Sequence, residues 1–329
     1  MRVLMVGAGI IGSIYGWALS DSGHDVVHLV RRGRAAELRD GMTVDMLDLR
    51  KGRKRRFRGA YKLTATESVS PADGFELVVV PVKHYALVET LKELVPAAGG
   101  GDFFLLTQNW RGTAEIDPVL PRTRYVYGDA KAGGAFSAGT LIAALKAIDI
   151  GPPEGEPTGL AAKVAAVFLS AGMRTGLHSD MLHYLWVQYA LNAGPGAALV
   201  QAGSFDALLS DREAAAAALT AARECLEVLR QRGVDLSAYP ETKAFLANSA
   251  LRRLVLGWIM RWKFRHDEYV KGCSSHALGG LVEVVVFYDD LIATGHDLGV
   301  AMPVMDSYAE GMRRFAAEAC KAYPRASGD

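Results

Sequence analysis

The segment GAGIIG, residues 7–12, constrains the fold of this chain more than any other part of the sequence. It follows the short apolar run RVLMVG and opens residues 10–22, which have the composition of a helix closed by Gly23. Glycines spaced as GxGxxG between a buried strand and a helix are the fingerprint of dinucleotide-binding folds. The sequence therefore predicts a nucleotide-binding βαβ unit at the start of the chain, and a glycine-rich turn without a ligand is the alternative.

The three glycines of this segment have separate roles in such a fold. The first allows a tight turn, the second lets the backbone approach a pyrophosphate, and the third lets the helix lie close to the sheet. The amino end of the helix also offers backbone amides and a partial positive charge to phosphate groups. We expect Gly7, Gly9, Ile10, Ile11 and Gly12 to form part of the cofactor-binding site.

Strand and helix patterns alternate over the first half of the chain. Apolar runs of strand length occur at 25–30, 75–83, 102–109, 124–129 and 145–151, and helical patterns at 85–95 and 159–172. This alternation predicts a parallel sheet with helical crossovers. After about residue 178 the strand patterns stop, and long helices are expected near 180–202, 211–232, 240–268, 275–298 and 302–321.

These patterns predict an α/β fold in two domains. A Rossmann-type parallel-sheet domain is expected at 1–178, followed by an all-helical domain at 179–329. The chain has 329 residues, and half of them are apolar, so it can bury a substantial core.

Charge and cysteine content limit the classes of partner. The formal net charge is only +1, which gives no general attraction to nucleic acid or to anionic membranes. The basic run at 50–59 is expected to be a solvated hairpin or loop, and the apolar run at 254–260 is too short to span a bilayer. The 3 cysteines are far apart and lack metal-ligand spacing, which favours a reducing cytoplasm and no metal site.

The end of the second expected strand bears on the choice of cofactor. It reads HLVRRGR, so Arg31 follows Val30 at once. NAD-binding folds usually place a carboxylate at this point to accept the ribose 2′-hydroxyl. Here Arg31, Arg32 and Arg34 offer guanidinium groups suited to a 2′-phosphate. The sequence therefore favours NADP(H) over NAD(H), with ordinary solvated arginines as the alternative.

A family resemblance rests on five segments, which read GAGIIGSIYGWALSDSGHDVVHLVRRGRAAELRDG, FELVVVPVKHYAL, LLTQNWRG, LWVQYALNAG and LVEVVVFYDDLIATGHDLGVAMPV. Over nearly the whole chain, these segments resemble motifs of the ketopantoate reductases (2-dehydropantoate 2-reductases). The resemblance implies that Lys83 lies in the cofactor site and that Asn109 contacts both cofactor and substrate. It also implies that Glu283 lies in the substrate site. The glycine that follows the asparagine in the family is Trp110 in this chain.

The chain departs from this family pattern on one helix face. Tyr184, Gln188, Asn192 and Gly196 recur at four-residue spacing, and the family has its general-acid lysine at position 188 and a second asparagine at 196. A glutamine amide donates a hydrogen bond but is not a practical acid near pH 7. Losing general acid catalysis costs about 10²–10⁴ in rate, so the sequence predicts a substrate other than, or in addition to, ketopantoate.

Three explanations of this substitution are open. Another residue supplies the proton, with candidates Lys83, Lys131, His183, Tyr184 and His276. Alternatively, the substrate is a protonated imine, which needs no acid, and Glu283 stabilises its positive charge. In the third, the protein is a catalytically silent sensor or interaction protein that binds NADP(H).

The expected site lies in a cleft between the domains, at the carboxyl ends of the strands. Its catalytic residues are expected to be Lys83, Gln188, Asn192 and Glu283. Substrate contacts are expected from Asn109, Trp110, Lys131, Tyr184, Ser275 and His276, with core packing as the alternative for the aromatic side chains. We expect a small-molecule substrate and neither a nucleic-acid nor a membrane partner, and the apolar helices of the second domain are compatible with a homodimer.

Overall fold

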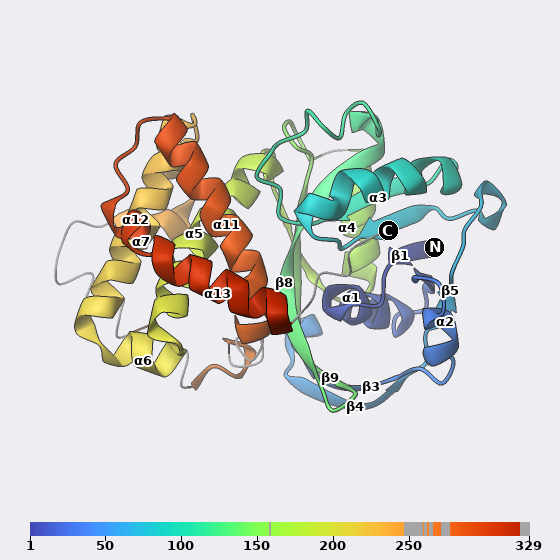
Figure 1. The fold of residues 1–329 in the computed structure, drawn as a ribbon. Helices are drawn as coiled ribbons and strands as arrows, with labels where there is room; N and C mark the ends of the chain where they lie inside the picture. Colours follow the sequence, from blue (N-terminus) through green and yellow to red (C-terminus); the bar gives the residue numbers. More distant parts are fainter. Residues whose placement is uncertain (158, 247–258, 260–261, 263–265, 271–276, 323–329) are drawn as a thin grey trace. The chain divides into compact units, whose positions relative to one another are not determined.

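The structure of the chain, a computed structural model, divides into two compact units (Figure 1). One comprises Met1–Leu185 and Glu268–His276, and the other comprises Trp186–Asp267 and Ala277–Asp329. The structure describes residues 1–157, 159–246, 259, 262, 266–270 and 277–322, with the backbone alone at 277–282 and 319–322. The expected boundary between functional domains at residue 178 stays a prediction.

The first unit is built on one ten-stranded sheet. The strands are β1 Arg2–Val6, β2 Asp25–Leu29, β3 Met42–Asp48, β4 Arg55–Tyr61, β5 Thr64–Thr66, β6 Leu77–Val80, β7 Asp102–Leu106, β8 Tyr125–Ser137, β9 Thr140–Gly151 and β10 Arg174–Leu177. Their order is β4-β3-β9-β8-β7-β6-β1-β2-β5, with β10 beside β9. The β3–β4 and β8–β9 pairs are antiparallel and the other pairs are parallel. The predicted Rossmann-type, mainly parallel sheet is confirmed.

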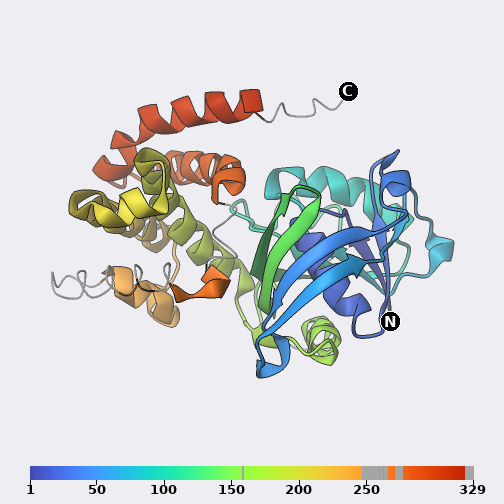
Figure 2. The same cartoon turned by 90° about the horizontal axis from the view of Figure 1, so that it is seen from below.

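Helices cover both faces of this sheet because alternate strand residues point to opposite faces. Val3 and Met5 of β1 share one buried core with α1 (Ile10–Ser20) and α4 (Leu160–Ser170). Figure 2 shows α3 (His84–Ala97) on the other side of the sheet. The sheet is therefore covered on both faces, and its exposed parts are the strand ends and the outer strands.

The basic run at 50–59 forms part of an outer strand. It enters β4, which pairs antiparallel with β3 at one end of the sheet, so the predicted hairpin is confirmed. The run is not solvated throughout, because Arg50 is buried and donates to Asp48 and Asp21 at 2.9 and 2.8 Å. Arg56 and Arg58 of β4 are exposed, and their guanidinium groups donate to Asp45 of β3 at 2.6 and 3.1 Å. Charged side chains on an edge strand oppose pairing with another chain, which is a structural role for this run.

Several predicted boundaries were wrong. The expected strand at 75–83 ends at Val80, and Lys83 is already the N-cap of α3. The expected strands at 124–129 and 145–151 belong to one long hairpin of β8 and β9, which turns at Ala138 and Gly139 with φ of 45° and 78°. Strands β3, β5 and β10 and the short helix α2 (Arg34–Glu37) were not predicted, because their patterns are short or polar.

The described part of the second unit is helical, as predicted. Helix α5 (Met181–Ala202) begins in the first unit and continues in the second. The others are α6 Phe205–Ser210, α7 Arg212–Gln231, α8 Lys243–Leu246, α11 Ala277–Asp297, α12 Pro303–Ser307 and α13 Ala309–Ala322, with the short 3₁₀ turns η4 Leu236–Ala238 and η5 Pro240–Thr242 before α8. Much of the helix expected at 240–268 falls outside the described residues.

The helix expected at 302–321 is in fact two helices, α12 and α13. The first amides of α12, at Val304 and Met305, donate to the buried Glu224 carboxylate of α7 at 3.0 and 2.9 Å. A carboxylate at this end satisfies amides that have no partner within the helix. The contact therefore fixes the start of α12 on α7.

Within the described ranges, no helix has the length and apolar character needed to cross a membrane. The same residues contain no group of three or more His, Cys, Asp or Glu side chains that could hold a metal ion. Cys225 is a buried free thiol, and the side chains of Cys273 and Cys320 lie outside the described part.

Candidate functional site

Four segments that the sequence assigned to a cofactor site follow neighbouring strands of the sheet. Gly7 comes directly after β1, Arg31 follows β2, and the exposed Lys83 and the buried Asn109 follow β6 and β7. Strands β2, β1, β6 and β7 are adjacent and parallel, so their carboxyl ends meet at one edge of the sheet. Open α/β sheets bind ligands at this edge, so the fold brings these four segments to a suitable place.

The glycine segment has a shape that fits a dinucleotide pyrophosphate. Gly7 has a φ of 86°, and its amide donates to Leu29 O at 2.7 Å. A Cβ atom on Gly12 would lie 3.0 Å from Gly7 O, whereas a Cβ on Gly9 would meet nothing within 4 Å. No side chain caps the start of α1 at Gly9, and the first amides of a helix can bind a phosphate.

A buried histidine forms a hydrogen bond with the glycine segment. His28 of β2 contacts Gly7 O through Nδ1 at 2.9 Å and Tyr61 OH through Nε2 at 2.9 Å. Because a carbonyl oxygen can only accept, Nδ1 carries the proton and Nε2 accepts from the tyrosine. Burial lowers the pKa of His28, although the bond to Gly7 opposes this shift. Tyr61 lies at the end of β4, 33 positions from His28 in the sequence, so no sequence pattern pointed to this arrangement.

A carboxylate does lie near the end of β2, although the sequence of β2 itself has none there. It belongs to the residue that follows β5. Glu67 directly follows β5, which pairs with β2, and its Oε1 accepts from the amides of Gly33 and Ala35 at 2.9 and 3.1 Å. Arg31 and Arg32 of the same loop have exposed side chains. The sequence analysis missed Glu67, because β5 was not recognised as the neighbour of β2.

Asn109 shapes the loop that follows β7. Its side-chain amide donates to Gly112 O at 2.5 Å and to Tyr127 OH at 2.7 Å, and its oxygen accepts from the amide of Arg111 at 3.0 Å. Trp110 is only 4% exposed, so its ring lies in the core. The internal bonds of Asn109 support a role in holding this loop, and its contacts with cofactor and substrate stay a prediction.

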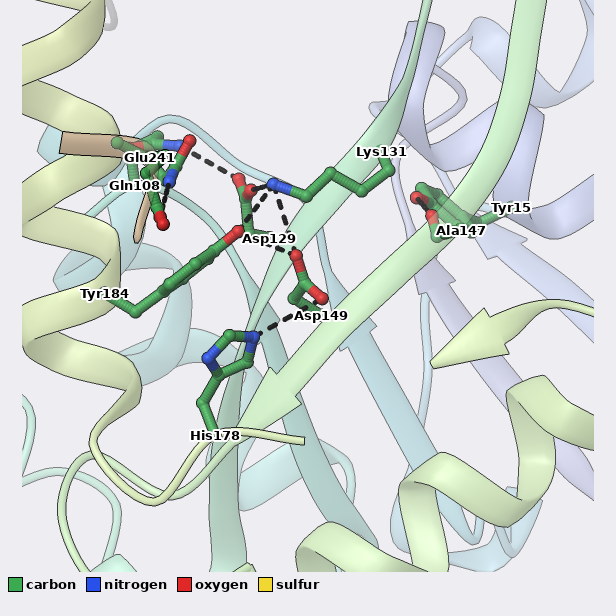
Figure 3. Close-up of polar contacts among 10 residues, drawn as sticks. Tyr15, Gln108, Asp129, Lys131, Ala147, Asp149, His178, Tyr184 and Glu241 are labelled. Atoms are coloured by element: carbon green, nitrogen blue, oxygen red, sulfur yellow. Dashed lines mark hydrogen bonds and ion pairs between the residues drawn. The ribbon is translucent and has the colours of Figure 1, made fainter. Parts of the chain in front are cut away.

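A charged cluster lies beside this loop (Figure 3). The Lys131 ammonium donates to Asp129 at 2.5 Å and to Tyr184 OH at 2.7 Å, and it lies 3.2 Å from Asp149. Tyr184 OH in turn donates to Asp149 at 2.8 Å, and Gln108 donates to Asp129 at 3.0 Å. The cluster therefore joins two of the predicted substrate residues, Lys131 and Tyr184, to two carboxylates that the sequence analysis did not identify.

The pKa directions show what this cluster can do. Burial alone would lower the pKa of Lys131, but the adjacent Asp129 carboxylate and Tyr184 outweigh it and raise that pKa. Burial and the charge of Asp129 raise the pKa of Tyr184. Burial opposes ionisation of Asp149, but hydrogen bonds from His178 and Tyr184 lower its pKa to about 2. Lys131 and Tyr184 therefore hold their protons firmly near pH 7, which makes both of them poor proton donors.

The predicted residues Gln188, Asn192 and Glu283, on α5 and α11, belong to the second unit. Gln188 is half-buried and donates from Nε2 to Glu241 Oε1 at 3.0 Å, whereas Asn192, one turn further on, is exposed. Glu283 is half-buried on α11. Glu241 was not identified from the sequence, because it lies 53 positions from Gln188. His183 pairs with Asp180 at the start of α5 at 2.7 Å, and the predicted Ser275 and His276 lie outside the described residues.

Comparison with known proteins supports the assignment of the fold. Residues 3–151 match the family described as ketopantoate reductase PanE/ApbA. The 2-dehydropantoate 2-reductase of Pyrococcus abyssi is 27% identical over 204 residues, which cover 59% of this chain and 61% of that protein. The chain thus spans about three fifths of the length of the curated relatives that it matches.

Two solved structures share the fold over almost the whole chain. The 2-dehydropantoate 2-reductase of Geobacter metallireducens has a TM-score of 0.72 at 19% identity and covers 95% of this chain and 99% of its own. A D-mandelate dehydrogenase solved with NADH has a TM-score of 0.69 at 14% identity and covers 97% and 99%. Residues 3–151 thus match the ketopantoate reductase family, and almost the whole chain shares the fold of these two structures.

Proposed function

We propose that the protein is an NADPH-dependent oxidoreductase that reduces a C=O or C=N bond of a small substrate other than, or in addition to, ketopantoate. The observation that carries this proposal is the gathering of the glycine segment, Arg31, Lys83 and Asn109 at the carboxyl edge of one parallel sheet. When bound there, a reduced nicotinamide supplies hydride to an electrophilic carbon. The match of residues 3–151 to a family of reductases supports the same chemistry.

The exposed guanidinium groups of Arg31 and Arg32 support NADP(H) as the cofactor. Glu67 holds the loop that carries them, through the amides of Gly33 and Ala35. A 2′-phosphate would gain charge-assisted hydrogen bonds from such a loop. The cofactor preference therefore depends on this loop and can be measured directly.

The residues of the site have separate proposed roles. Lys83 is the proposed proton source for a carbonyl substrate, because Lys131 and Tyr184 hold their protons too firmly. Gln188 and Asn192 offer amide groups that orient the substrate, and Glu283 offers a carboxylate. A homodimer in the cytoplasm is part of the proposal, and sedimentation velocity at micromolar concentration tests the dimer.

The first experiment measures NADPH binding by calorimetry. We expect binding by the wild-type protein, a loss of about 10-fold or more in Arg31→Ala, and little change in Arg39→Ala, an exposed arginine on the same segment. If the wild-type protein does not bind NADPH, the proposal is wrong.

The second experiment measures turnover. The protein is incubated with NADPH and panels of 2-oxo acids and cyclic imines, and the absorbance of the reduced cofactor is followed. Turnover of any member supports an enzyme. NADPH binding without turnover of any compound in the panels would instead favour a catalytically silent sensor. This alternative arises because position 188 holds a glutamine, which cannot act as a general acid.

A further inference from the structure

Strand β2 binds both main-chain polar groups of Gly7. The Gly7 amide donates to Leu29 O at 2.7 Å, and the Gly7 carbonyl oxygen accepts from Nδ1 of His28 at 2.9 Å. Gly7 has a φ of 86°, a left-handed value that glycine adopts without strain. The first turn of the glycine segment is therefore held by one main-chain bond and by one bond from a side chain.

Helix α1 lies close to both groups of this side-chain bond. A Cβ atom on Gly12, in the first turn of α1, would be 3.0 Å from Gly7 O. The His28 ring is fully buried, and a Cβ atom on Gly16 would be 2.5 Å from its Nε2. The two glycines of α1 thus leave room for the carbonyl group and the imidazole, and the close packing keeps the ring in one orientation.

Tyr61 determines which nitrogen of the His28 ring carries the proton. Its hydroxyl lies 2.9 Å from Nε2 of His28 and 3.3 Å from Oγ of Ser20. Burial raises the pKa of Tyr61 to about 12, although the bond to Ser20 opposes this shift, and burial lowers the pKa of His28. The phenol therefore keeps its proton and donates it to Nε2, so the neutral imidazole donates from Nδ1 to Gly7 O.

The direction of the Gly7 carbonyl also sets the direction of the next amide. The peptide bond between Gly7 and Ala8 is trans and planar, so its C=O and N–H bonds point in opposite directions. The bond from His28 thus fixes the Ala8 amide before any ligand binds. Because dinucleotide folds bind phosphate with amides of this turn and of the following helix, a turn that is ordered in advance should bind more tightly.

We propose that His28 is a positioning residue for NADPH, which acts through the Gly7 carbonyl and does not itself touch the cofactor. This inference rests on the proposed function, because that function assigns the pyrophosphate to the glycine segment. The residues that carry it all lie in the first unit. A side chain that only filled the core could be replaced by another of similar volume, whereas a positioning residue requires a donor at the place of Nδ1.

Two amide substitutions separate positioning from packing. The side-chain nitrogen of asparagine is as many bonds from Cα as Nδ1 of histidine, and that of glutamine is as many as Nε2. His28→Asn therefore keeps a donor for Gly7 O, whereas His28→Gln keeps the contact with Tyr61 and leaves Gly7 O without this donor. Asparagine is also the smaller residue and leaves the larger cavity, so His28→Asn should have the lower Tm.

Calorimetric titration of the full chain with NADPH measures the affinities. We expect His28→Gln to weaken binding by about 10-fold or more, and His28→Asn to stay within about 3-fold of the wild-type affinity in spite of its lower Tm. His24 directly precedes β2 and gives the matched control, since His24→Gln should not change the affinity. Equal affinities of the two His28 variants, or a weaker affinity of His28→Asn, overturn the inference, while NADPH binding by the wild-type protein still supports the proposed function. Failure of the wild-type protein to bind NADPH overturns the proposed function itself.

A second measurement uses the wild-type protein and so does not depend on the folding of these variants. The ¹⁵N chemical shifts of labelled histidine report which ring nitrogen carries the proton, and Tyr61→Phe, which removes the donor to Nε2, identifies the signals of His28. We expect the proton on Nδ1 both without and with NADPH. A proton on Nε2 alone would leave no hydrogen bond to Gly7 O and would overturn the inference.

Discussion

Gly196 of α5 lies so close to Val284 of α11 that a Cβ atom on residue 196 would be 2.7 Å from Cγ1 of the valine. We therefore predict that Gly196→Asn, which introduces the residue of the resembled family, destabilises the protein by about 1–3 kcal/mol through overpacking. Val284→Ala should restore much of the loss when the two changes are combined. Thermal unfolding of the single and double variants measures this coupling, and additive losses would contradict it.

Glu67 contacts the loop that carries Arg31, so we predict that its loss changes the affinities for NADPH and NADH by different amounts. Glu67→Ala removes the acceptor for the amides of Gly33 and Ala35 and should loosen the loop that carries Arg31. NADPH affinity should then fall about 10-fold, and NADH affinity should fall less, because only NADPH carries the 2′-phosphate. Glu67→Gln keeps an acceptor oxygen and should retain more of the NADPH affinity.

Calorimetric titrations with NADPH and with NADH measure this difference in affinity. Glu89→Gln, an exposed glutamate on α3, controls for the change in net charge. Equal losses for NADPH and NADH in Glu67→Ala would point to a structural role alone. Tighter NADPH binding in that variant would mean that the carboxylate repels the phosphate.

His28 predicts a dependence of stability on pH. Burial lowers its pKa, so the imidazole is neutral in the folded protein and takes up a proton more readily in the unfolded chain. The stabilising contribution is present above the unfolded pKa of about 6.5 and is lost as pH falls through the lower folded pKa. His28→Gln should reduce the fall in Tm between pH 7 and pH 5. A variant with the wild-type dependence on pH would exclude His28 as the cause.

The Lys131 cluster predicts a large loss of stability when its cation is removed. Lys131→Met leaves the Asp129 and Asp149 carboxylates facing each other across β8 and β9. Because the lysine side chain is 30% exposed, we expect a cost on the order of 2–3 kcal/mol, below that of a fully buried pair. Lys163→Met, which breaks the more exposed pair with Asp102, should cost less than about 1 kcal/mol.

Adding Asp149→Asn to the Lys131→Met variant provides a second measurement. It removes one of the two uncompensated charges, so it should return part of the lost stability at pH 7. Chemical denaturation, analysed with one m-value for both variants, gives the free energy of unfolding of each. No recovery in the double variant would mean that the loss comes from packing of the lysine side chain.

Local sequence patterns determined the class of fold and predicted the edge of the sheet at which a cofactor is expected. GAGIIG between an apolar run and a helix specifies a strand–turn–helix unit, because the tight turn and the close helix require glycine. The family resemblance assigned Lys83 and Asn109 to the same site, and each follows an apolar strand whose carboxyl end lies at this edge. Such signals are contained within about ten residues, so they can be read without the fold.

Only the tertiary structure decided which side chains meet. Glu67 reaches the end of β2 through the pairing of β5, Lys131 meets Tyr184 across 53 positions, and Gln188 meets Glu241 across the same separation. Hydrogen bonds and charges act over a few ångströms in space, whatever the distance along the chain. The sequence showed the glutamine at position 188. Its charged neighbour Glu241 could be identified only from the packing of the helices.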